Sequence, residues 1–346
     1  MPIEARRVFR LALTVALALA GGYALPLPLP YIGPLFAFFL AVNPGPPIGP
    51  KGLLGLVLVL LITLGVGLLL VPLLEYYAFA GVLIVGVGLY FSNDLALRRG
   101  QALVGTLLTV GFTLISAAGL ASYQVATTVI QALVFGIALA IICQWLVYPW
   151  FPEDATTAAP KKPAGPAQAG VGWLAARATL IVLPAYLMAL ANPTAYMPLI
   201  MKAVSLGQQG SVDSARHAGR ELLGSTFLGG CYAVLFWFGL KLCPSLWMFF
   251  LWMLLFGLYF AGKLYGVFDS RFPPSFWINT AVTMLIMLGP AVQDSANGKD
   301  VYAAFAVRMA LFVALTLYAG FAIQLLEHWR TRRLRRGFTA NAAEAA

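Results

Sequence analysis

Long apolar runs separated by short polar segments fill most of the chain, and the apolar residues within each run are continuous. A helix needs roughly 20 apolar residues to cross the hydrocarbon core of a bilayer, whereas a transmembrane barrel shows short segments of alternating hydrophobicity. The pattern therefore predicts an all-α, polytopic helical membrane protein with about twelve transmembrane helices. The predicted segments are residues 8–24, 31–43, 53–74, 76–91, 102–120, 123–150, 173–190, 196–206, 221–242, 246–267, 276–292 and 301–329.

Two of these segments are short and are flanked or interrupted by proline. The first lies in PLPLPYIGPLFAFFLAVNPGPPIGP, residues 26–50, and its apolar run covers only residues 35–42. The second follows Asn192-Pro193 and has its apolar run at residues 199–206. Proline removes a backbone donor and clashes with the preceding turn. Because transporters build substrate sites from interrupted helices in corresponding positions of two halves, we expect a short, broken second helix in each half.

Weak internal similarity relates the two halves of the chain. Leu89-Tyr90-Phe91 recurs 169 positions later as Leu258-Tyr259-Phe260, and an offset of 167 places Arg10 on Arg177. Six spans per copy, an even number, give both copies the same orientation. The sequence thus predicts two parallel six-helix repeats. They are residues 1–150 and 173–329, joined by a flexible Pro/Ala-rich cytoplasmic linker at 151–172 and followed by a basic tail at 330–346.

Composition agrees with a lipid-embedded chain. Of the 346 residues 61% are hydrophobic and 10% are charged, and the mean hydropathy is +0.87, whereas soluble domains average about 25% charged residues. The N-terminal segment could pass for a signal peptide, but its counterpart in the second half leads us to expect that it belongs to the fold.

The net charge of +10 comes from basic residues that gather in alternate loops, the distribution that the positive-inside rule describes. This favours contact with a lipid bilayer over nucleic acid, and it places both termini in the cytoplasm. The loops predicted to be cytoplasmic hold Lys51, Arg98, Arg99, Lys161, Lys162, Lys202, Arg216, Arg220, Lys263 and Arg271, and those predicted outside hold only Lys241 and Lys299.

Residues for catalysis or metal binding do not form a recognisable set. The three cysteines lie in or beside apolar segments without metal-ligand spacing, and the chain has two histidines. Gly257 to Lys263 resembles the start of a phosphate-binding loop, but Leu264 replaces the Ser or Thr and no strand precedes it. We therefore expect no enzyme, no metal, no cofactor and no disulfide framework.

Charges inside apolar segments are expensive, so they are candidates for function. Arg308 lies within the last span. It is either a contact for a substrate anion, or it snorkels to the interface or pairs with Asp294 or Asp300. Arg10 and Arg177 begin the two repeats. They either snorkel to the headgroups or form an entrance that attracts anions.

Two acids are candidates for proton coupling. Asp94 is either a proton carrier or the partner of Arg98 in a cytoplasmic turn, and Glu221 is either a coupling residue or an acid favoured by a helix N-terminus. Aromatic residues near the breaks or the repeated motif either anchor the protein at the interface or line a site for an aromatic substrate: Tyr31, Tyr90, Tyr196 and Tyr259. Pro34, in the first break, is a further candidate for the substrate site.

Several features together resemble the fusaric acid resistance and aromatic acid exporter superfamily, in particular a small subgroup of domain-of-unknown-function type from Gram-negative bacteria. These features are the arginine-led first helix, the segment PLPLPYIGPLFAFFLAVNPGPP, a third helix that begins after Lys51 and a six-span unit repeated around a linker. The resemblance is best over residues 6–150 and weaker over 173–329. Larger members carry sizeable cytoplasmic domains after the membrane units, whereas the linker and tail here are short.

The resemblance implies export of hydrophobic or aromatic carboxylic acids across the bacterial inner membrane. It also implies a periplasmic adaptor of the membrane-fusion type and an outer-membrane channel as partners. Our first hypothesis is therefore an organic-anion exporter driven by the proton-motive force. An organic-anion channel of the malate-channel kind and a non-transporting membrane scaffold are the alternatives, and homo-oligomer formation is left open.

Overall fold

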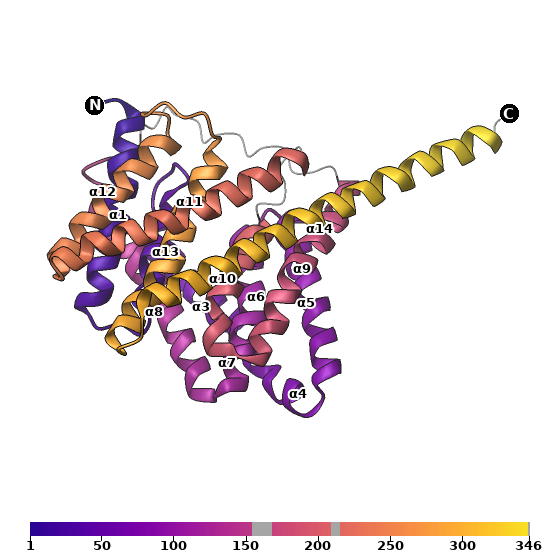
Figure 1. The fold of residues 1–346 in the computed structure, drawn as a ribbon, viewed down its shortest axis with the longest axis horizontal. Coiled ribbons are helices and arrows are strands. Elements are labelled where there is room, and N and C mark those ends of the chain that lie inside the picture. The colour runs from indigo at the N-terminus through magenta and orange to yellow at the C-terminus, as the bar shows by residue number, and fades with distance from the viewer. Residues whose placement is uncertain (154–167, 209–214, 345–346) are drawn as a thin grey trace.

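Helices make up all the regular structure that a computed structural model describes, which covers residues 1–153, 168–208 and 215–344 (Figure 1). The all-α prediction is thereby confirmed for these residues. In the first half the helices are α1 (Ile3–Ala24), α2 (Ile32–Ala41), α3 (Pro50–Leu69), α4 (Val71–Tyr76), α5 (Ala78–Arg98), α6 (Ala102–Val110), the π-helix η1 (Gly111–Ile115), α7 (Ser116–Ala121) and α8 (Tyr123–Val147). In the second they are α9 (Gln168–Ala191), α10 (Pro193–Gln208), α11 (Ala215–Leu242), α12 (Leu246–Leu264), α13 (Pro274–Ala296) and α14 (Val301–Glu344).

Ten stretches of helix among the described residues are long and apolar enough to cross a bilayer, with α3–α4 and α6–η1–α7 each counted as one. Large apolar side chains such as Leu54, Phe79 and Trp247 are more than two-thirds exposed, as lipid-facing residues are. These features indicate a multi-pass membrane protein. The two remaining predicted spans contain the short apolar helices at 32–41 and 195–207, as their prolines led us to expect.

Proline sets the bounds of α2. Pro34 lies in its first turn, where a missing backbone donor costs nothing. The helix ends at Ala41, just before the prolines at 44, 46 and 47, and α3 begins on Pro50, a favourable first helical position.

Several helices extend beyond the predicted segments. Helix α9 begins five residues before position 173, and α11 begins at Ala215 instead of 221. Helix α10 includes Pro193 and Pro198, so neither proline separates it into two pieces. Helix α14 runs as far as Glu344 through the predicted tail, and Figure 1 shows its end projecting from the bundle. Hydropathy marks the part of a helix that lipid covers, whereas backbone hydrogen bonding continues into polar turns. Most of the predicted linker, residues 154–167, lies outside the described residues.

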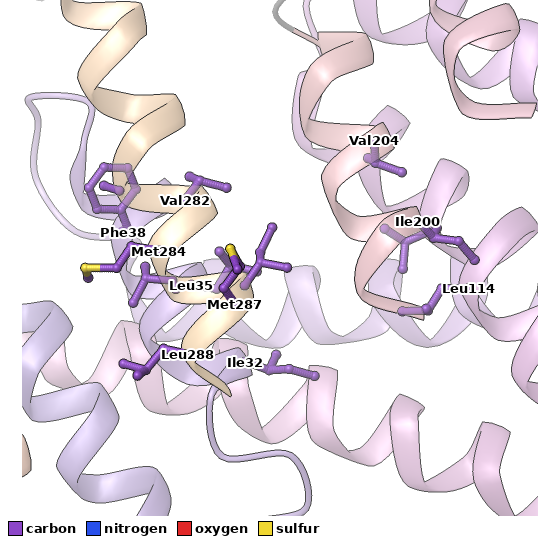
Figure 2. Close-up of a cluster of buried hydrophobic side chains, with 14 of the residues drawn as sticks. Ile32, Leu35, Phe38, Leu114, Ile200, Val204, Val282, Met284, Met287 and Leu288 are labelled. Carbon is purple, nitrogen blue, oxygen red and sulfur yellow. The ribbon is translucent and has the colours of Figure 1, made fainter. Parts of the chain in front are cut away.

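The first helix of each half packs against the fourth span of the other half. Helix α1 lies along α12, and α9 lies along α5 (Figure 1). The short helices also reach across. Ile32, Leu35 and Phe38 of α2 lie beside Met284 and Leu288 of α13, while α10 presents Ile200 and Val204 to Leu114 of η1 (Figure 2). The two halves therefore interlock instead of forming two separate bundles.

Glycine permits a close helix crossing within the first half, between α3 and η1. A Cβ atom on Gly67 of α3 would lie 2.1 Å from the carbonyl oxygen of Gly111, and one on Gly111 would lie 2.3 Å from the carbonyl oxygen of Thr63. In membranes, small residues let two helix backbones approach and gain packing contacts that lipid cannot supply. The contact falls at the start of η1, so α3 crosses the fifth span at the point where that span changes from an α-helix to a π-helix.

Candidate functional site

Lys202 on α10 is fully buried, with 0% of its side chain exposed. The sequence placed it in a cytoplasmic loop, and this prediction is wrong because α10 continues to Gln208 and carries Lys202 into the packed interior. Its ammonium donates hydrogen bonds to Asn279 Oδ1 at 2.8 Å and to Thr283 Oγ1 at 2.6 Å, both on α13. The signal for it was a single basic residue inside the short apolar run at 199–206, directly after a proline-rich start.

The hydrogen bonds continue from Asn279 into α11, and we call the group formed by Lys202, Ser225, Thr226, Asn279 and Thr283 the polar cluster. The Asn279 amide nitrogen donates to Ser225 Oγ at 2.5 Å and lies 3.4 Å from Thr226 Oγ1. Because an ammonium only donates, the amide oxygen must face Lys202 and the amide nitrogen must face the hydroxyls. All five side chains are buried, so the cluster fixes one arrangement of α10, α11 and α13.

No carboxylate among the described residues forms an ion pair with Lys202. An ammonium has three donors, and the hydrogen bonds to Asn279 and Thr283 use two. Burial of an unpaired charge is costly, so an ionised Lys202 would gain from an anion placed beside it. The cluster can therefore act as an interior cationic site.

Arg308 forms an ion pair with Asp294, and Lys299 Nζ lies 3.8 Å from the same carboxylate. The predicted pairing of Arg308 with Asp294 is thus confirmed. The second terminal nitrogen of Arg308, Nη1, is buried without a hydrogen-bond partner, so the guanidinium keeps a donor available. A role for Arg308 in binding substrate stays a prediction.

Tyr31 and Pro34 lie together, as predicted for the first helix break, and line a narrow apolar pocket with Gly289 of α13. A Cβ atom on Gly289 would lie 2.1 Å from the Tyr31 ring, so this glycine is required for α2 to approach α13. Tyr196 is half-buried near the start of α10, the corresponding break. The structure does not bring Tyr196 into the pocket of Tyr31.

Arg10 and Arg177 are both buried and both form ion pairs. Arg10 Nη1 lies 2.8 Å from Glu153 Oε2, just after α8, and Arg177 Nη1 lies 3.3 Å from Glu327 Oε1 on α14. Each guanidinium thus joins the first span of a half to the end of its last span. Burial alone would raise the pKa of Glu153, but hydrogen bonds from Arg7 and Arg10 outweigh it and hold this pKa below its ordinary value. Glu153 is therefore ionised at neutral pH.

The two candidates for proton coupling lie near helix ends. Arg98 Nε lies 2.7 Å from Asp94 Oδ2 within α5, so the partner predicted for Asp94 is confirmed, although in a helix and not in a turn. Ser275 donates to Glu221 at 2.5 Å. Glu221 is not an N-terminal acid, because α11 begins six residues before it and has no acid in its first turn.

Tyr90 and Tyr259, the matching tyrosines of the repeated motif, lie in different surroundings. Tyr90 packs edge-on against Phe91 at a ring distance of 5.6 Å. Tyr259 belongs to an aromatic group with Tyr232, Phe260 and Trp277, and it accepts a hydrogen bond from Tyr232 at 3.2 Å. The candidate residues are thus distributed along the bundle and do not form one site. Within the described part of the chain, no group of three His, Cys, Asp or Glu side chains could hold a metal ion.

Comparison with known proteins gives one similarity. Residues 7–147 match a family described as "Protein of unknown function (DUF2955)", and the match ends with α8, close to the predicted boundary at residue 150. No curated protein matches, and no solved structure does. The first six predicted spans are therefore similar to this family.

Proposed function

We propose that the protein is a multi-pass transporter that exports aromatic or other hydrophobic organic acids across the bacterial inner membrane, driven by the proton-motive force. The observation that carries this proposal is Lys202, a fully buried lysine with neutral partners on a short helix. Ionisable residues inside a membrane bundle mark substrate or ion pathways, and short helices in matching positions border transporter sites. The carboxylate of an organic acid would supply the counter-charge that the described residues do not.

Aromatic and sulfur-containing side chains that pack against α13, the helix that carries part of the cluster, support a hydrophobic substrate. Helix α13 carries Asn279 and Thr283 of the polar cluster and also Leu285, which lines two apolar pockets between α1, α2, α12 and α13. The pockets share Met253, and their other lining residues include Phe38, Phe249 and Phe260. The larger has a volume of only about 10 Å³, too small for an organic acid, so transport requires these helices to separate.

The packing of the helices supports the two-repeat architecture. If the halves are related by a two-fold axis, a contact between α1 and α12 requires one between α9 and α5, and a contact between α2 and α13 requires one between α10 and the fifth span. Both pairs of contacts are present. Rocking of two such repeats about sites between them is a common route to alternating access. In this proposal a periplasmic adaptor and an outer-membrane channel receive the exported acid.

Cells that lack the chromosomal gene, compared with and without the protein expressed from a plasmid, test the proposal. Cells expressing the protein should grow on higher concentrations of benzoate or related aromatic acids and accumulate less of them. Lys202→Met should abolish both effects, because it keeps the length of the side chain and removes its charge. Lys51→Met, a change at an exposed lysine on α3, should leave both unchanged. An uncoupler should remove the protection if the proton-motive force drives export.

Two results would contradict the proposal. One is equal accumulation of every acid in a broad aromatic panel with and without the protein. The other is normal export by a Lys202→Met protein that is present in the membrane at the wild-type level, which would exclude the polar cluster as the site.

A further inference from the structure

A polar pocket lies beside Arg10, between α1, the end of α8 and the segment that follows α2. Its volume is about 30 Å³, enough for one or two water molecules or for a carboxylate group. Arg10, Gln144 and Asn43 supply its polar lining, and Pro46, Pro47 and Tyr148 supply an apolar wall. It shares no lining residue with the polar cluster of Lys202.

Two residues that line this pocket each have a buried donor without a hydrogen-bond partner. Arg10 is 5% exposed and Gln144 is 7% exposed, and no hydrogen bond is made by Arg10 Nη2 or by the Gln144 amide nitrogen, Nε2. Buried polar groups in native proteins are nearly always hydrogen-bonded, so a pocket that holds two unpaired donors requires an acceptor. That acceptor is either water or a ligand with exposed oxygen atoms.

Charge favours an anion over water. Arg7 and Arg10 both pair with the single carboxylate of Glu153, so these three side chains carry one net positive charge beside the pocket. The other terminal nitrogen of Arg10, Nη1, is already bonded to Glu153 and to the Phe151 carbonyl oxygen. The guanidinium is thereby held in place with Nη2 left for a ligand. Arg10 and Gln144 both line this small pocket, and a guanidinium donor beside an amide donor matches the two oxygens of a carboxylate.

We propose that Arg10 Nη2 and Gln144 Nε2 form a carboxylate-binding site, separate from Lys202, at which the carboxylate of an aromatic acid docks. The ring needs more room than this pocket offers, so its entry requires the segment with Pro46 and Pro47 to move outward. The identity of the ligand rests on the proposed transport function, whereas the oxyanion chemistry rests on the two donors. In this arrangement the acid meets Arg10 near one end of α1 before it reaches the interior cation.

Photolabelling of the whole protein in membranes tests the site. The probe is 4-azidosalicylate, and the labelled peptides are identified by mass spectrometry. We expect labelling within residues 40–47 or 144–148, with competition by benzoate and none by benzyl alcohol. Gln144→Leu should weaken labelling about ten- to a hundredfold, the loss expected when a hydrogen bond to a charged group is removed. Gln131→Leu on the exposed face of α8 is the matched control and should label like the wild type.

The outcomes separate this site from the transport proposal. Wild-type protein that exports benzoate but is not labelled in these two segments would overturn the site and leave the transport function intact. Labelling that Gln144→Leu leaves unchanged would also overturn it. Competition by phosphatidylglycerol vesicles but not by benzoate would assign the pocket to a lipid phosphate and refute the substrate assignment. Labelling that shows the expected competition in a protein without export activity would support the site and contradict the transport function.

Discussion

Four charged side chains are buried among the described residues, and three of them have an ion-pair partner. Arg10 pairs with Glu153, Arg177 with Glu327, and Asp294 with Arg308. Lys202 is the exception, because its partners are an amide and a hydroxyl. A buried charge that already has an ion-pair partner is explained by that structural contact. Lys202 has no such partner among the described residues, so it is the strongest candidate for binding an anion.

Thr283→Val tests whether the polar cluster holds Lys202 in place. The change removes the hydroxyl acceptor at 2.6 Å and leaves the ammonium with one fewer partner, so it should cost about 1–3 kcal/mol of stability. Thr280→Val on the same helix is the control, because the Thr280 hydroxyl bonds only to the Phe276 carbonyl oxygen of its own helix. Thermal unfolding in detergent would measure both. An equal loss of stability in the two variants would mean that the hydrogen bond to Lys202 adds no stability of its own.

Helix ends and helix crossings in this protein follow from its prolines and glycines. Proline begins α3 and limits α2, and the short helices that result can pack against the centre of α13 and of the fifth span in the first half. Glycine sets how near the crossing helices approach. The crossing of α3 and η1 places a backbone carbonyl where a Cβ atom on Gly67 would lie.

Gly67→Ala should therefore force α3 and η1 apart. The added methyl group meets backbone at 2.1 Å, and overpacking of this kind costs about 1–3 kcal/mol. Gly65→Ala, two residues away on the same helix, meets nothing within 4 Å and should be neutral or stabilise by up to about 1 kcal/mol. Thermal unfolding monitored by size-exclusion chromatography distinguishes them. A Gly67→Ala protein as stable as Gly65→Ala would show that the close approach is not needed.

At the scale of the whole molecule, several helices of one half pack against helices of the other half. Helix α1 lies against α12, α9 against α5, and α13 lies between the polar cluster and the apolar pockets. The apolar pockets lie between helices of the two halves, so movement of one half against the other changes their surroundings, whereas the hydrogen-bond partners of Lys202 lie in its own half. A transporter with alternating access needs such coupling between distant spans.

Cysteine cross-linking tests the interlocked arrangement. A Cβ atom on Gly257 of α12 would lie 3.2 Å from the Ala12 Cβ on α1, slightly closer than the separation of about 3.5–4.5 Å found in disulfides. In a variant without the native cysteines, Ala12→Cys with Gly257→Cys should form a disulfide on oxidation. Ala12→Cys with Gly86→Cys is the control, because Gly86 has no neighbour within 4 Å. A disulfide only in the control pair would contradict the packing of α1 on α12.

The sequence predicted the helical segments well because burial in lipid demands long apolar runs, and each run is visible without knowledge of its neighbours. The prolines between positions 26 and 50 likewise predicted that the second helix, α2, would be short. The ends of α9, α11 and α14 were misjudged because helical hydrogen bonding extends past the apolar part, as at Glu221, which lies inside α11. Pairing of Arg98 with Asp94 was foreseeable, since residues four apart share one face of a helix.

Tertiary structure decided everything that depends on contacts between distant helices. Lys202 looked like a loop residue under the positive-inside rule, and only the packing of α10 against α13 shows it bonded to Asn279 and Thr283. The same holds for Gln144, because nothing in the sequence distinguishes it from the other glutamines of its span or places its amide in the same pocket as Arg10. A sequence records the length and polarity of each helix, which are local properties. Which polar groups meet inside the bundle depends on how helices far apart in the chain cross, and this is settled only when they pack.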